Sequence, residues 1–467
     1  MLESGAMSLA VIVLAAGQGK RMHSALPKVL HPLAGRPLLA HVLDAARSLK
    51  PKQILVVHGH GGAEVRAAFA DTRVEWVEQA KQLGTGHALA QALPRVARGA
   101  QVLVLNGDVP LVRAATLERL VAAAKSGLAI CSSDLTDPTG YGRVLRDARK
   151  RVRRIVEHKD ASAKELRVRE WYAGFLAAPA QRLAAWLAKV KPANAQKEYY
   201  LTDVIGLAAK DGVNIATVKA EDPREVAGVN SRHELALLER AFQNAQAKKL
   251  LEAGVALADL WRVDVRGELS CGRDVAIDVN CVFEGEVRLG DRVRIGPNCV
   301  LRNVTVGADT EILGFTFLDA ATIGQRCRIG PFARMRPGVM LDDAVHIGNF
   351  VELKASRIGA GSKANHLAYI GDAEVGARVN VGAGTITCNY DGRAKHFTSI
   401  GADAFIGSNA ALVAPVKIGA GAVVGAGSVI ARNVAPGALA LTRPAHREVK
   451  GWIRRRGAAK GKKKKAR

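Results

Sequence analysis

The sequence predicts an α/β doubly wound, Rossmann-like domain followed by a left-handed parallel β-helix of hexapeptide repeats. Residues 8–230 alternate continuous apolar runs with helical patterns, which is typical of buried parallel strands joined by helices. From about residue 260 an aliphatic–glycine pair recurs at intervals of six or close to a multiple of six. Such a short period is the signature of a solenoid. A chain of 467 residues can hold both units.

The first half supplies the strands and helices that a doubly wound sheet needs. We expect strands over Leu9–Leu14, Gln53–Val57 and Val102–Leu105, and helices over Leu39–Leu49 and Ala115–Lys125. In such sheets ligands bind beyond the carboxyl ends of the strands. The segments that follow the predicted strands are therefore the candidates for a site.

In the second half, three six-residue rungs would make one triangular coil. We expect the aliphatic residue of each pair to point inward and stack on its equivalent one coil away, while the glycine turns the corner. The loop Thr387–Ser399 is expected to interrupt the repeat. The pairs include Leu289-Gly290, Ile295-Gly296, Ile329-Gly330, Ile347-Gly348, Ile370-Gly371, Val381-Gly382, Ile406-Gly407 and Val424-Gly425.

Four segments are predicted from these patterns. They are an α/β domain over 1–230, a linker helix over 231–254, a β-helix domain over 255–453, and a disordered basic tail over 454–467. The formal charge is +25, and residues 450–467 carry ten cations without an acid. The surplus is thus partly a solvated tail. Nucleic acid is not the expected partner, and the remaining positive charge suits anionic substrates.

Composition excludes several classes of protein. Hydrophobic residues make up 48% of the chain, which excludes a disordered protein. The six cysteines show no CxxC spacing and are expected to be reduced thiols. The first six residues lack an apolar leader, and no run of about 18 apolar residues exists, so we expect a cytoplasmic protein without a membrane span.

A glycine-rich loop follows the first predicted strand. The backbone of Leu14, Ala15, Ala16 and Gly17 could approach phosphates closely, as glycine-rich loops do. The loop is neither a Walker A motif nor a dinucleotide fingerprint. Two cations, Arg21 and Lys28, follow it. These favour a polyphosphate site over the alternative of a structural turn with surface bases.

A second motif, Asn106-Gly107-Asp108, ends another predicted strand. Asp108 and the more distant Asn230 could supply oxygens to Mg²⁺, a hard ion that usually keeps several waters. Alternatively, Asp108 only caps the next helix. The spacing alone leaves both interpretations open.

In the β-helix, His366 is the candidate general base for an acyl transfer from a thioester to an amine. Glu352 precedes it by fourteen residues, which suggests that Glu352 orients the imidazole from a neighbouring coil. Arg336 and Lys354 could bind a sugar phosphate. We expect Cys388 to be an inert small side chain, because a thioester donor is already activated.

Together these residues closely resemble the bacterial bifunctional N-acetylglucosamine-1-phosphate uridyltransferase / glucosamine-1-phosphate N-acetyltransferase family. The resemblance covers roughly residues 8–453. The blocks that carry it are Leu14–Lys28, Gln82–His87, Asp137–Arg143, Ile155–Asp160, Lys363–Asp372 and Val381–Gly392.

The resemblance implies two sites and their ligands. In the first domain, UTP and N-acetylglucosamine 1-phosphate would react with Mg²⁺ held by Asp108 and Asn230. In the second domain, acetyl-coenzyme A would be the co-substrate and His366 the proton acceptor, in a homotrimer whose site lies between neighbouring β-helices. The resemblance places the nucleotide at Leu14–Gly17, Lys28, Gln79, Gly84 and Thr85; the N-acetylglucosamine sugar at Gly142 and Glu157; glucosamine 1-phosphate at Arg336, Lys354, Tyr369 and Asn380; and acetyl-coenzyme A at Ala383, Asn389, Tyr390, Ser408, Ala426 and Arg443.

Two residues depart from the family pattern. Lys20 replaces a usual threonine, on what should be an exposed loop, and Tyr172 stands where many members have an asparagine that contacts the sugar. We expect the Tyr172 hydroxyl to replace that contact with the sugar; the alternative is that the side chain simply forms a wall.

Two other functions fit parts of the sequence. A nucleotidyltransferase with a purely regulatory β-helix would not need His366, Asn389 and Tyr390. A non-catalytic translation-factor subunit of the same architecture would not need Arg21, Lys28, Asp108 and Asn230 together.

Overall fold

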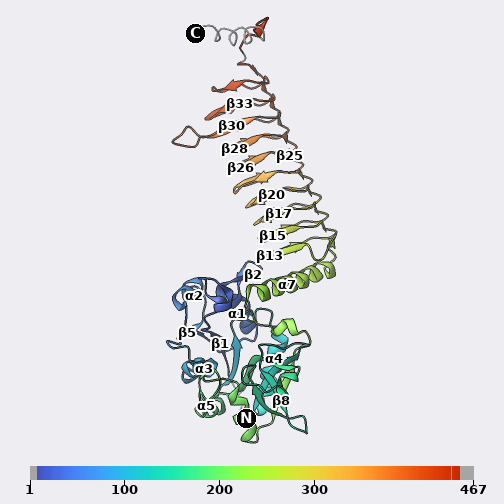
Figure 1. Cartoon of the computed structure of the whole chain (residues 1–467). Helices are drawn as coiled ribbons and strands as arrows, with labels where there is room; N and C mark the ends of the chain where they lie inside the picture. The colour runs from blue at the N-terminus through green and yellow to red at the C-terminus, as the bar shows by residue number, and fades with distance from the viewer. Residues whose placement is uncertain (1–7, 443, 453–467) are drawn as a thin grey trace, which may run out of the picture. The chain divides into compact units, whose positions relative to one another are not determined.

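The computed structural model describes residues 8–442 and 444–452, so the predicted tail over 454–467 lies outside the described residues. The chain forms two compact units (Figure 1). The first contains the chain up to Lys249 together with Asp264–Gly267, and the second contains Leu250–Val263 and the residues from Glu268 onward.

The N-terminal unit is built on one mixed sheet. Its strand order is β11-β7-β10-β6-β1-β4-β5, and β8 pairs with β10 and β9. The central pairs β1–β4 and β1–β6 are parallel, whereas β10 runs antiparallel to β6 and β7. The strands are β1 (Leu9–Ala15), β4 (Gln53–His58), β5 (Glu75–Glu78), β6 (Gln101–Asn106), β7 (Leu128–Asp134), β8 (Arg143–Arg146), β9 (Val152–Val156), β10 (Glu170–Pro179) and β11 (Ile215–Lys219), with the small hairpin β2 (Pro32–Leu33) and β3 (Arg36–Pro37).

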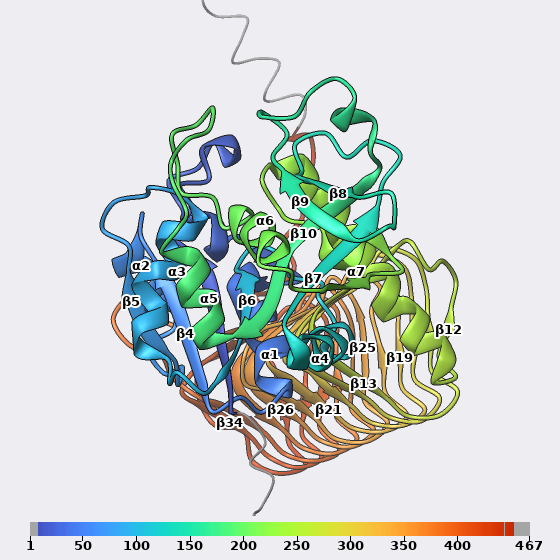
Figure 2. The ribbon, with the colours of Figure 1, turned by 90° about the horizontal axis from the view of Figure 1, so that it is seen from below.

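Helices cover both faces of this sheet (Figure 2). Helices α3, α5 and α6 pack on one face, and α1, α2 and α4 pack on the other. Along β1 the side chains alternate between the two cores, with Ile12 in one and Val11 and Val13 in the other, as a strand covered on both faces requires. The helices are α1 (Leu38–Ser48), α2 (Gly62–Ala68), α3 (Thr85–Ala92), α4 (Ala114–Ala123), α5 (Ala180–Leu187), α6 (Asp203–Lys210) and α7 (Arg232–Glu252), with short 3₁₀ turns η1 (Lys20–Met22), η2 (Lys28–Leu30), η3 (Leu93–Arg95), η4 (Ala124–Ser126), η5 (Glu165–Arg167) and η6 (Pro223–Val226).

The C-terminal unit is a parallel β-helix. Its strands stack into two long sheets, of 11 and 15 strands among the residues described. The strands are β12 (Ala256–Leu257), β13 (Val263–Cys271), β14 (Ala276–Ile277), β15 (Cys281–Leu289), β16 (Arg294–Ile295), β17 (Val300–Arg302), β18 (Thr305–Val306), β19 (Glu311–Ile312), β20 (Phe317–Asp319), β21 (Ala321–Ile323), β22 (Arg328–Ile329), β23 (Arg334–Met335), β24 (Val339–Leu341), β25 (His346–Asn349), β26 (Glu352–Ile358), β27 (Lys363–His366), β28 (Tyr369–Val375), β29 (Asn380–Val381), β30 (Ile386–Cys388), β31 (Thr398–Ile400), β32 (Phe405–Ile406), β33 (Ala411–Val413), β34 (Val416–Ile418), β35 (Val423–Val424), β36 (Val429–Ile430) and β37 (Leu439–Ala440).

The predicted aliphatic ladder is present in the register of these strands. Ile295 stacks on Ile312, and the same column continues through Ile329 and Ile347. All four side chains are buried. The predicted fold, including a left-handed β-helix of hexapeptide repeats, is therefore confirmed.

The glycines of the repeat stand at the start of the corners, and the spacing between coils gives a further reason for them. A Cβ on Gly348 would lie 1.9 Å from the Asn365 carbonyl oxygen, and one on Gly407 would lie 2.4 Å from the Ala426 nitrogen. The left-handed residue of a corner is a glycine at Gly330, with φ of 96°, and a non-glycine at positions such as Asn298, with φ of 59°. Glycine follows the aliphatic residue because the next coil passes too close for a side chain.

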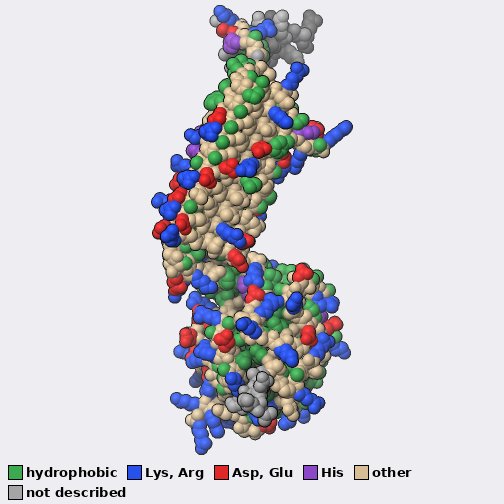
Figure 3. All heavy atoms as spheres, turned by 180° about the vertical axis from the view of Figure 1, so that it is seen from behind, with side chains coloured by type: hydrophobic (Ala, Val, Ile, Leu, Met, Phe, Trp, Pro, Cys, Tyr) green, Lys and Arg blue, Asp and Glu red, His purple; other side chains and the backbone are tan. Residues whose placement is uncertain are grey.

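Charged side chains of opposite sign lie side by side on the surface of the β-helix unit, as Figure 3 shows. Arg292 binds Asp309, Arg326 binds Asp343 and Arg378 binds Asp403, each across one coil. These pairs are exposed to solvent, so each contributes little to the stability of the fold. Among the described helices, none is long and apolar enough to cross a membrane.

Candidate active sites

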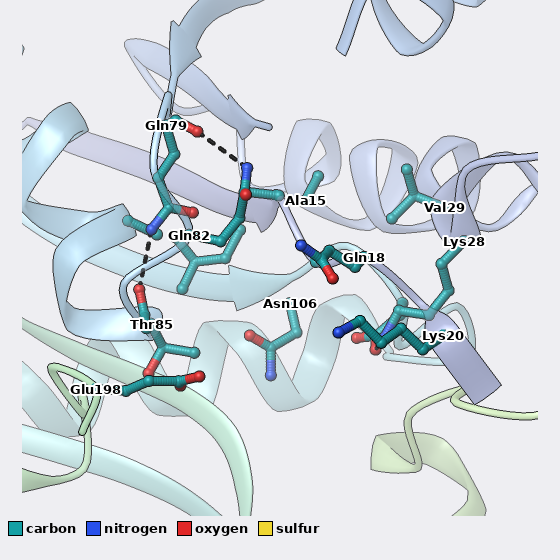
Figure 4. A pocket seen from close by; sticks show the side chains of 16 residues that line it. Ala15, Gln18, Lys20, Lys28, Val29, Gln79, Gln82, Thr85, Asn106 and Glu198 are labelled. Carbon is teal, nitrogen blue, oxygen red and sulfur yellow. Dashed lines mark hydrogen bonds and ion pairs between the residues drawn. The ribbon is translucent and has the colours of Figure 1, made fainter. Parts of the chain in front are cut away.

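A cavity of about 560 Å³ opens at the carboxyl ends of the central strands of the N-terminal unit. Ten of its lining residues are predicted site residues: Leu14, Ala15, Ala16, Gly17, Lys28, Gln79, Gly84, Thr85, Asn106 and Asp108. Figure 4 shows Gln79 and Thr85 at one end and Lys20 and Lys28 at the other, with Asn106 between them. The cavity thus has an amide- and hydroxyl-lined end and a cationic end.

The glycine-rich loop is tight enough to place its backbone beside Lys28. Gly19 adopts φ of 61°, and a Cβ there would lie 2.8 Å from the Lys28 Cβ. The loop continues into the 3₁₀ turn η1, which contains Lys20 and Arg21. Lys20 lines the cavity, whereas Arg21 is exposed and is not among the lining residues. The role assigned to Arg21 stays a prediction.

At the other end of the cavity, a network of hydrogen bonds fixes the loop before α3. The buried Gln79 donates from Nε2 to the Gly84 carbonyl oxygen at 3.1 Å, and Gln82 donates to the Gln79 carbonyl oxygen at 3.2 Å. Thr85 Oγ1 accepts from the backbone of Leu201 at 3.0 Å. These bonds fix the conformation of the chain at this end of the cavity.

Three side chains converge at the cationic end. The Lys28 ammonium contacts the Asp108 carboxylate and donates to Asn230 Oδ1 at 3.3 Å. Asp108 and Asn230 are brought together because the Val229 amide donates to the Asp108 carbonyl oxygen at 2.9 Å. The side chains of Lys28 and Asp108 are only 14% and 15% exposed.

The Asp108 carboxylate and the Asn230 amide oxygen both face the Lys28 ammonium. Oxygens of this kind are the ligands that Mg²⁺ prefers. No cluster of three or more His, Cys, Asp or Glu side chains that could hold a metal occurs in the described ranges. An ion held by Asp108 and Asn230 would therefore complete its coordination with water or with phosphate oxygens.

Gly142, Glu157 and Tyr172 form a second group beside this cavity. The Tyr172 amide donates to the Gly142 carbonyl oxygen at 2.9 Å, and Thr202 Oγ1 donates to Glu157 Oε1 at 2.9 Å. A Cβ on Gly142 would lie 3.5 Å from Glu157 Oε2. Burial raises the pKa of Glu157, and the Thr202 hydroxyl opposes that shift. The three residues predicted or weighed as sugar contacts are thus neighbours.

The Tyr172 hydroxyl itself is buried and has no hydrogen-bond partner among the residues described. Burial raises the pKa of this phenol, and the nearby Glu157 carboxylate raises it further. The side chain packs in the core on one face of the sheet.

In the β-helix, the predicted base His366 occupies a position that recurs once in every coil. The residues at this position form a column along the β-helix. Strand register places His366 directly beside Asn349. Extending the register of Val381, Ile406 and Val424 by two residues places Ala383, Ser408 and Ala426 at the same position of the following coils. The predicted base and three predicted acetyl-coenzyme A contacts therefore share one edge of the β-helix.

Asn349, and not Glu352, orients His366. The imidazole Nδ1 lies 2.8 Å from Asn349 Oδ1. An amide oxygen only accepts, so Nδ1 carries the proton and Nε2 keeps a free lone pair. The predicted Glu352 contact is wrong because one coil spans 17 or 18 residues: Glu352 pairs in register with Tyr369, and its carboxylate accepts from Arg336 at 3.3 Å.

Across the corner from His366 lies a second predicted group. Lys354 donates to both oxygens of Asp372 at 3.0 and 3.1 Å. Asn389 donates to Asp372 at 2.5 Å and to the Tyr369 hydroxyl at 3.3 Å. Arg336 lies one coil before Lys354 in the same column. Asp372 thus joins Lys354 and Asn389, and Asn389 joins Tyr369, whereas Arg336 pairs separately with Glu352.

A third cation, Lys395, reaches the same group from the loop after β30. The pKa of Lys354 is raised, first by the neighbouring Lys395 side chain and then by the Asp372 carboxylate. The pKa of Lys395 is lowered by Lys354, and Arg336 adds to the shift. Three basic side chains therefore lie near one another on this side of the β-helix.

Comparison with known proteins gives a family match in each of the two units. The model of the MobA-like NTP transferase domain matches residues 11–173, and that of the bacterial transferase hexapeptide (six repeats) matches residues 397–432. A relative from Aromatoleum aromaticum is 56% identical over 95% of this chain and 98% of its own; one from Alkalilimnicola ehrlichii is 56% identical over 96% of each chain; and one from Chromobacterium violaceum is 53% identical over 96% of this chain and 98% of its own. Each is named a bifunctional protein GlmU. The chain belongs to the GlmU family.

A solved nucleotidyl transferase from Methanothermobacter thermautotroptrophicus is also similar, with 23% identity and a TM-score of 0.39 over 51% of this chain and 99% of its own. The family assignment depends on the GlmU relatives alone.

Several residues at the two candidate sites of this GlmU family member were not predicted as site residues, and four of them are polar side chains with an evident place there. Lys20 and Glu198 line the cavity, Asn349 orients His366, and Lys395 joins the cationic group. Lys20 could have been found, because it stands in the glycine-rich loop beside Arg21. Glu198 carries no local signal, since it reaches the cavity only through tertiary packing against Gly84.

Arg443, a predicted coenzyme contact, lies outside the described residues. Tyr390 and Asn380 are described, at the start of the exposed loop after β30 and in β29. Their ligand contacts stay predictions.

Proposed function

We propose that the chain catalyses two consecutive steps of UDP-N-acetylglucosamine synthesis. The β-helix unit acetylates glucosamine 1-phosphate with acetyl-coenzyme A, and the N-terminal unit then transfers UMP from UTP to N-acetylglucosamine 1-phosphate, releasing pyrophosphate. The observation that supports this proposal is that one chain of the GlmU family has a cavity with Lys28, Asp108 and Asn230 at one end and, in another unit, His366 held by Asn349 across a corner from a group of basic side chains.

In uridylyl transfer, the uridine is proposed to lie at the Gln79, Gly84 and Thr85 end of the cavity. Its phosphates extend along the backbone of Leu14–Gly17 toward Lys28. Mg²⁺ bound by Asp108 and Asn230 supplies positive charge to the phosphates. The role of Arg21 is to add charge to the same end.

The attacking group is an oxygen of the sugar 1-phosphate, which is already ionised near neutral pH. It forms a bond to the α-phosphorus of UTP while the bond to the β-phosphate oxygen breaks, and pyrophosphate leaves. No general base is needed. Lys28 therefore acts by position and charge, as in other phosphoryl transfers.

The sugar is proposed to lie against Gly142 and Glu157. For Tyr172, the buried and unpartnered hydroxyl favours the wall over a direct contact with the sugar. Tyr172→Phe should therefore leave KM for N-acetylglucosamine 1-phosphate within twofold and should change the free energy of unfolding by about 1 kcal/mol or less. Steady-state kinetics and thermal unfolding test this. A rise in that KM with an unchanged KM for UTP would show instead that the hydroxyl binds the sugar.

In acetyl transfer, the amine of glucosamine 1-phosphate attacks the thioester carbonyl of acetyl-coenzyme A. His366 Nε2 takes the amine proton, Asn349 holds the imidazole, and coenzyme A leaves as the thiol. Arg336 and Lys354, with Lys395, are proposed to bind the sugar phosphate, beside Tyr369 and Asn380. Ala383, Asn389, Tyr390, Ser408, Ala426 and Arg443 are proposed to line the coenzyme side.

The acetyl site is proposed to lie between copies of the β-helix in a homotrimer. Three phenylalanines stack at successive corners, with ring centroids 5.0 and 5.3 Å apart, and are 54%, 45% and 56% exposed (Phe315, Phe332 and Phe350). Leu367, next to His366, continues this column and is 62% exposed. An apolar edge that leads to the base suits coverage by a second copy.

Acetyl transfer should therefore depend on assembly. Diluting the protein below the dissociation constant of the trimer should abolish acetyl transfer and leave uridylyl transfer per subunit unchanged. Activity and mass photometry over the same dilution series provide the measurement. Full acetyl transfer by a population of monomers would exclude a shared site.

The direct test of the proposed function is a product assay. The purified protein is incubated with glucosamine 1-phosphate, acetyl-coenzyme A, UTP and Mg²⁺, and UDP-N-acetylglucosamine is sought by mass spectrometry. Leaving out acetyl-coenzyme A should prevent its formation, and supplying N-acetylglucosamine 1-phosphate should restore it. No product under either condition would refute the proposal.

A further inference from the structure

The first turn of helix α7 contacts both halves of the cationic end of the cavity. Asn230, whose Oδ1 faces Lys28, lies two residues before the helix. Its backbone amide donates to Glu234 Oε2 at 2.7 Å. Glu234 in turn is fixed by its own amide, which donates to Ser231 Oγ at 3.2 Å.

The same turn holds the glycine-rich loop. Arg232 donates from Nε to the Met22 carbonyl oxygen at 3.1 Å. Met22 ends η1 and is buried in a small core with Leu33, Leu38, Val229 and Leu238, the last of which comes from α7. The loop with Lys20 and Arg21 is thus anchored to the helix by one hydrogen bond and one apolar cluster.

Neither Glu234 nor Arg232 lines the cavity, so neither is placed to touch the nucleotide. We infer that Glu234 and Arg232 are positioning residues for uridylyl transfer: Glu234 sets the place of the Asn230 oxygen, and Arg232 sets the place of the phosphate loop. This inference rests on the proposed function of the N-terminal unit.

The two hydrogen bonds show which chemical group each position requires: an acceptor at position 234 and a donor at position 232. The Asn230 amide needs an acceptor 2.7 Å away, which a glutamine oxygen can provide as well as a carboxylate. The Met22 carbonyl needs a donor, which a methionine at position 232 cannot provide. Partners of metal ligands typically contribute about 10–100-fold to metal affinity or activity.

Three variants of the full-length protein test the role of Glu234. Glu234→Ala removes the acceptor, and Glu234→Gln keeps one. Ser231→Ala is the matched control, because it removes the other bond of the same helix cap and leaves the Asn230 amide paired. Binding of Mn²⁺ in the presence of UTP, followed by electron paramagnetic resonance, gives a readout independent of turnover.

We expect Glu234→Ala to weaken Mn²⁺ binding by about tenfold and to lower uridylyl turnover by a similar factor. Glu234→Gln and Ser231→Ala should bind Mn²⁺ within twofold of the parent protein. Equal losses in Glu234→Ala and Ser231→Ala would show a merely structural cap and would overturn the inference, as would unchanged Mn²⁺ binding in Glu234→Ala.

Arg232→Met provides an independent arm, with the exposed neighbour His233→Gln as its control. We expect KM for UTP to rise by about fivefold in Arg232→Met, since the loss of one hydrogen bond of about 1 kcal/mol has that effect, and not to change in His233→Gln. An unchanged KM for UTP in Arg232→Met would show that Arg232 does not position the phosphate loop. If the parent protein showed no uridylyl transfer, the proposed function would fail, whereas the Mn²⁺ measurements would still decide the inference.

Discussion

Asp108→Ala is expected to lower kcat for uridylyl transfer by about a thousandfold and to leave acetyl transfer unchanged. Asp108 lies at the cationic end of the cavity, where its carboxylate faces the same point as the Asn230 oxygen. Removing it leaves one protein oxygen for Mg²⁺ and frees Lys28 from its partner. Pyrophosphate release and thiol release, measured on one preparation, report the two activities.

The matched control is Asp44→Ala, which removes an exposed carboxylate on α1 that only pairs with Arg36 and Arg47. It should change neither activity. The alternative of a helix cap does not apply, because the N-cap of the next helix, α4, is Arg113. Substantial uridylyl transfer by Asp108→Ala would therefore show that the metal interpretation of Asp108 is wrong.

His366→Ala is expected to have the opposite pattern. Loss of a general base lowers the rate by roughly 10²–10⁴-fold, and this loss should appear in acetyl transfer alone. The physical reason is that Nε2 is the free basic atom at the edge shared with Ala383 and Ser408, while Nδ1 is held by Asn349.

His346→Gln is the control for this variant, because His346 lies on the same strand as Asn349 but outside the column that contains His366. It should retain acetyl transfer. If His366→Ala retained acetyl transfer within tenfold while it stayed folded, another group would have to take the amine proton.

Much of the fold could be predicted from local pattern. The apolar runs at β1, β4 and β6 and the helices α1 and α4 fall within a residue or two of their expected bounds. The antiparallel strand β10 between β6 and β7 could not be predicted in this way. Strand direction depends on long-range pairing, which no short window of sequence contains.

The site residues also fall into two groups, those that local sequence predicts and those that depend on long-range register. Residues in a loop after a strand, such as Lys28 and Asp108, could be predicted because the carboxyl ends of parallel strands meet at one edge. The partner of His366 could not, because three six-residue rungs give 18 residues per coil, whereas His366 pairs with the residue 17 positions back. Once the register is known, Asn349 is the neighbour 17 residues back, and Glu352 belongs to Tyr369.

The central claim is that one chain carries two independent sites that act in sequence. Mixing the Asp108→Ala and His366→Ala proteins tests it most directly. Each alone, given glucosamine 1-phosphate, acetyl-coenzyme A, UTP and Mg²⁺, should form almost no UDP-N-acetylglucosamine. The mixture should form it at a rate comparable to the parent protein after a short lag, while N-acetylglucosamine 1-phosphate passes between molecules. Two inactive variants whose mixture also formed no product would contradict the account.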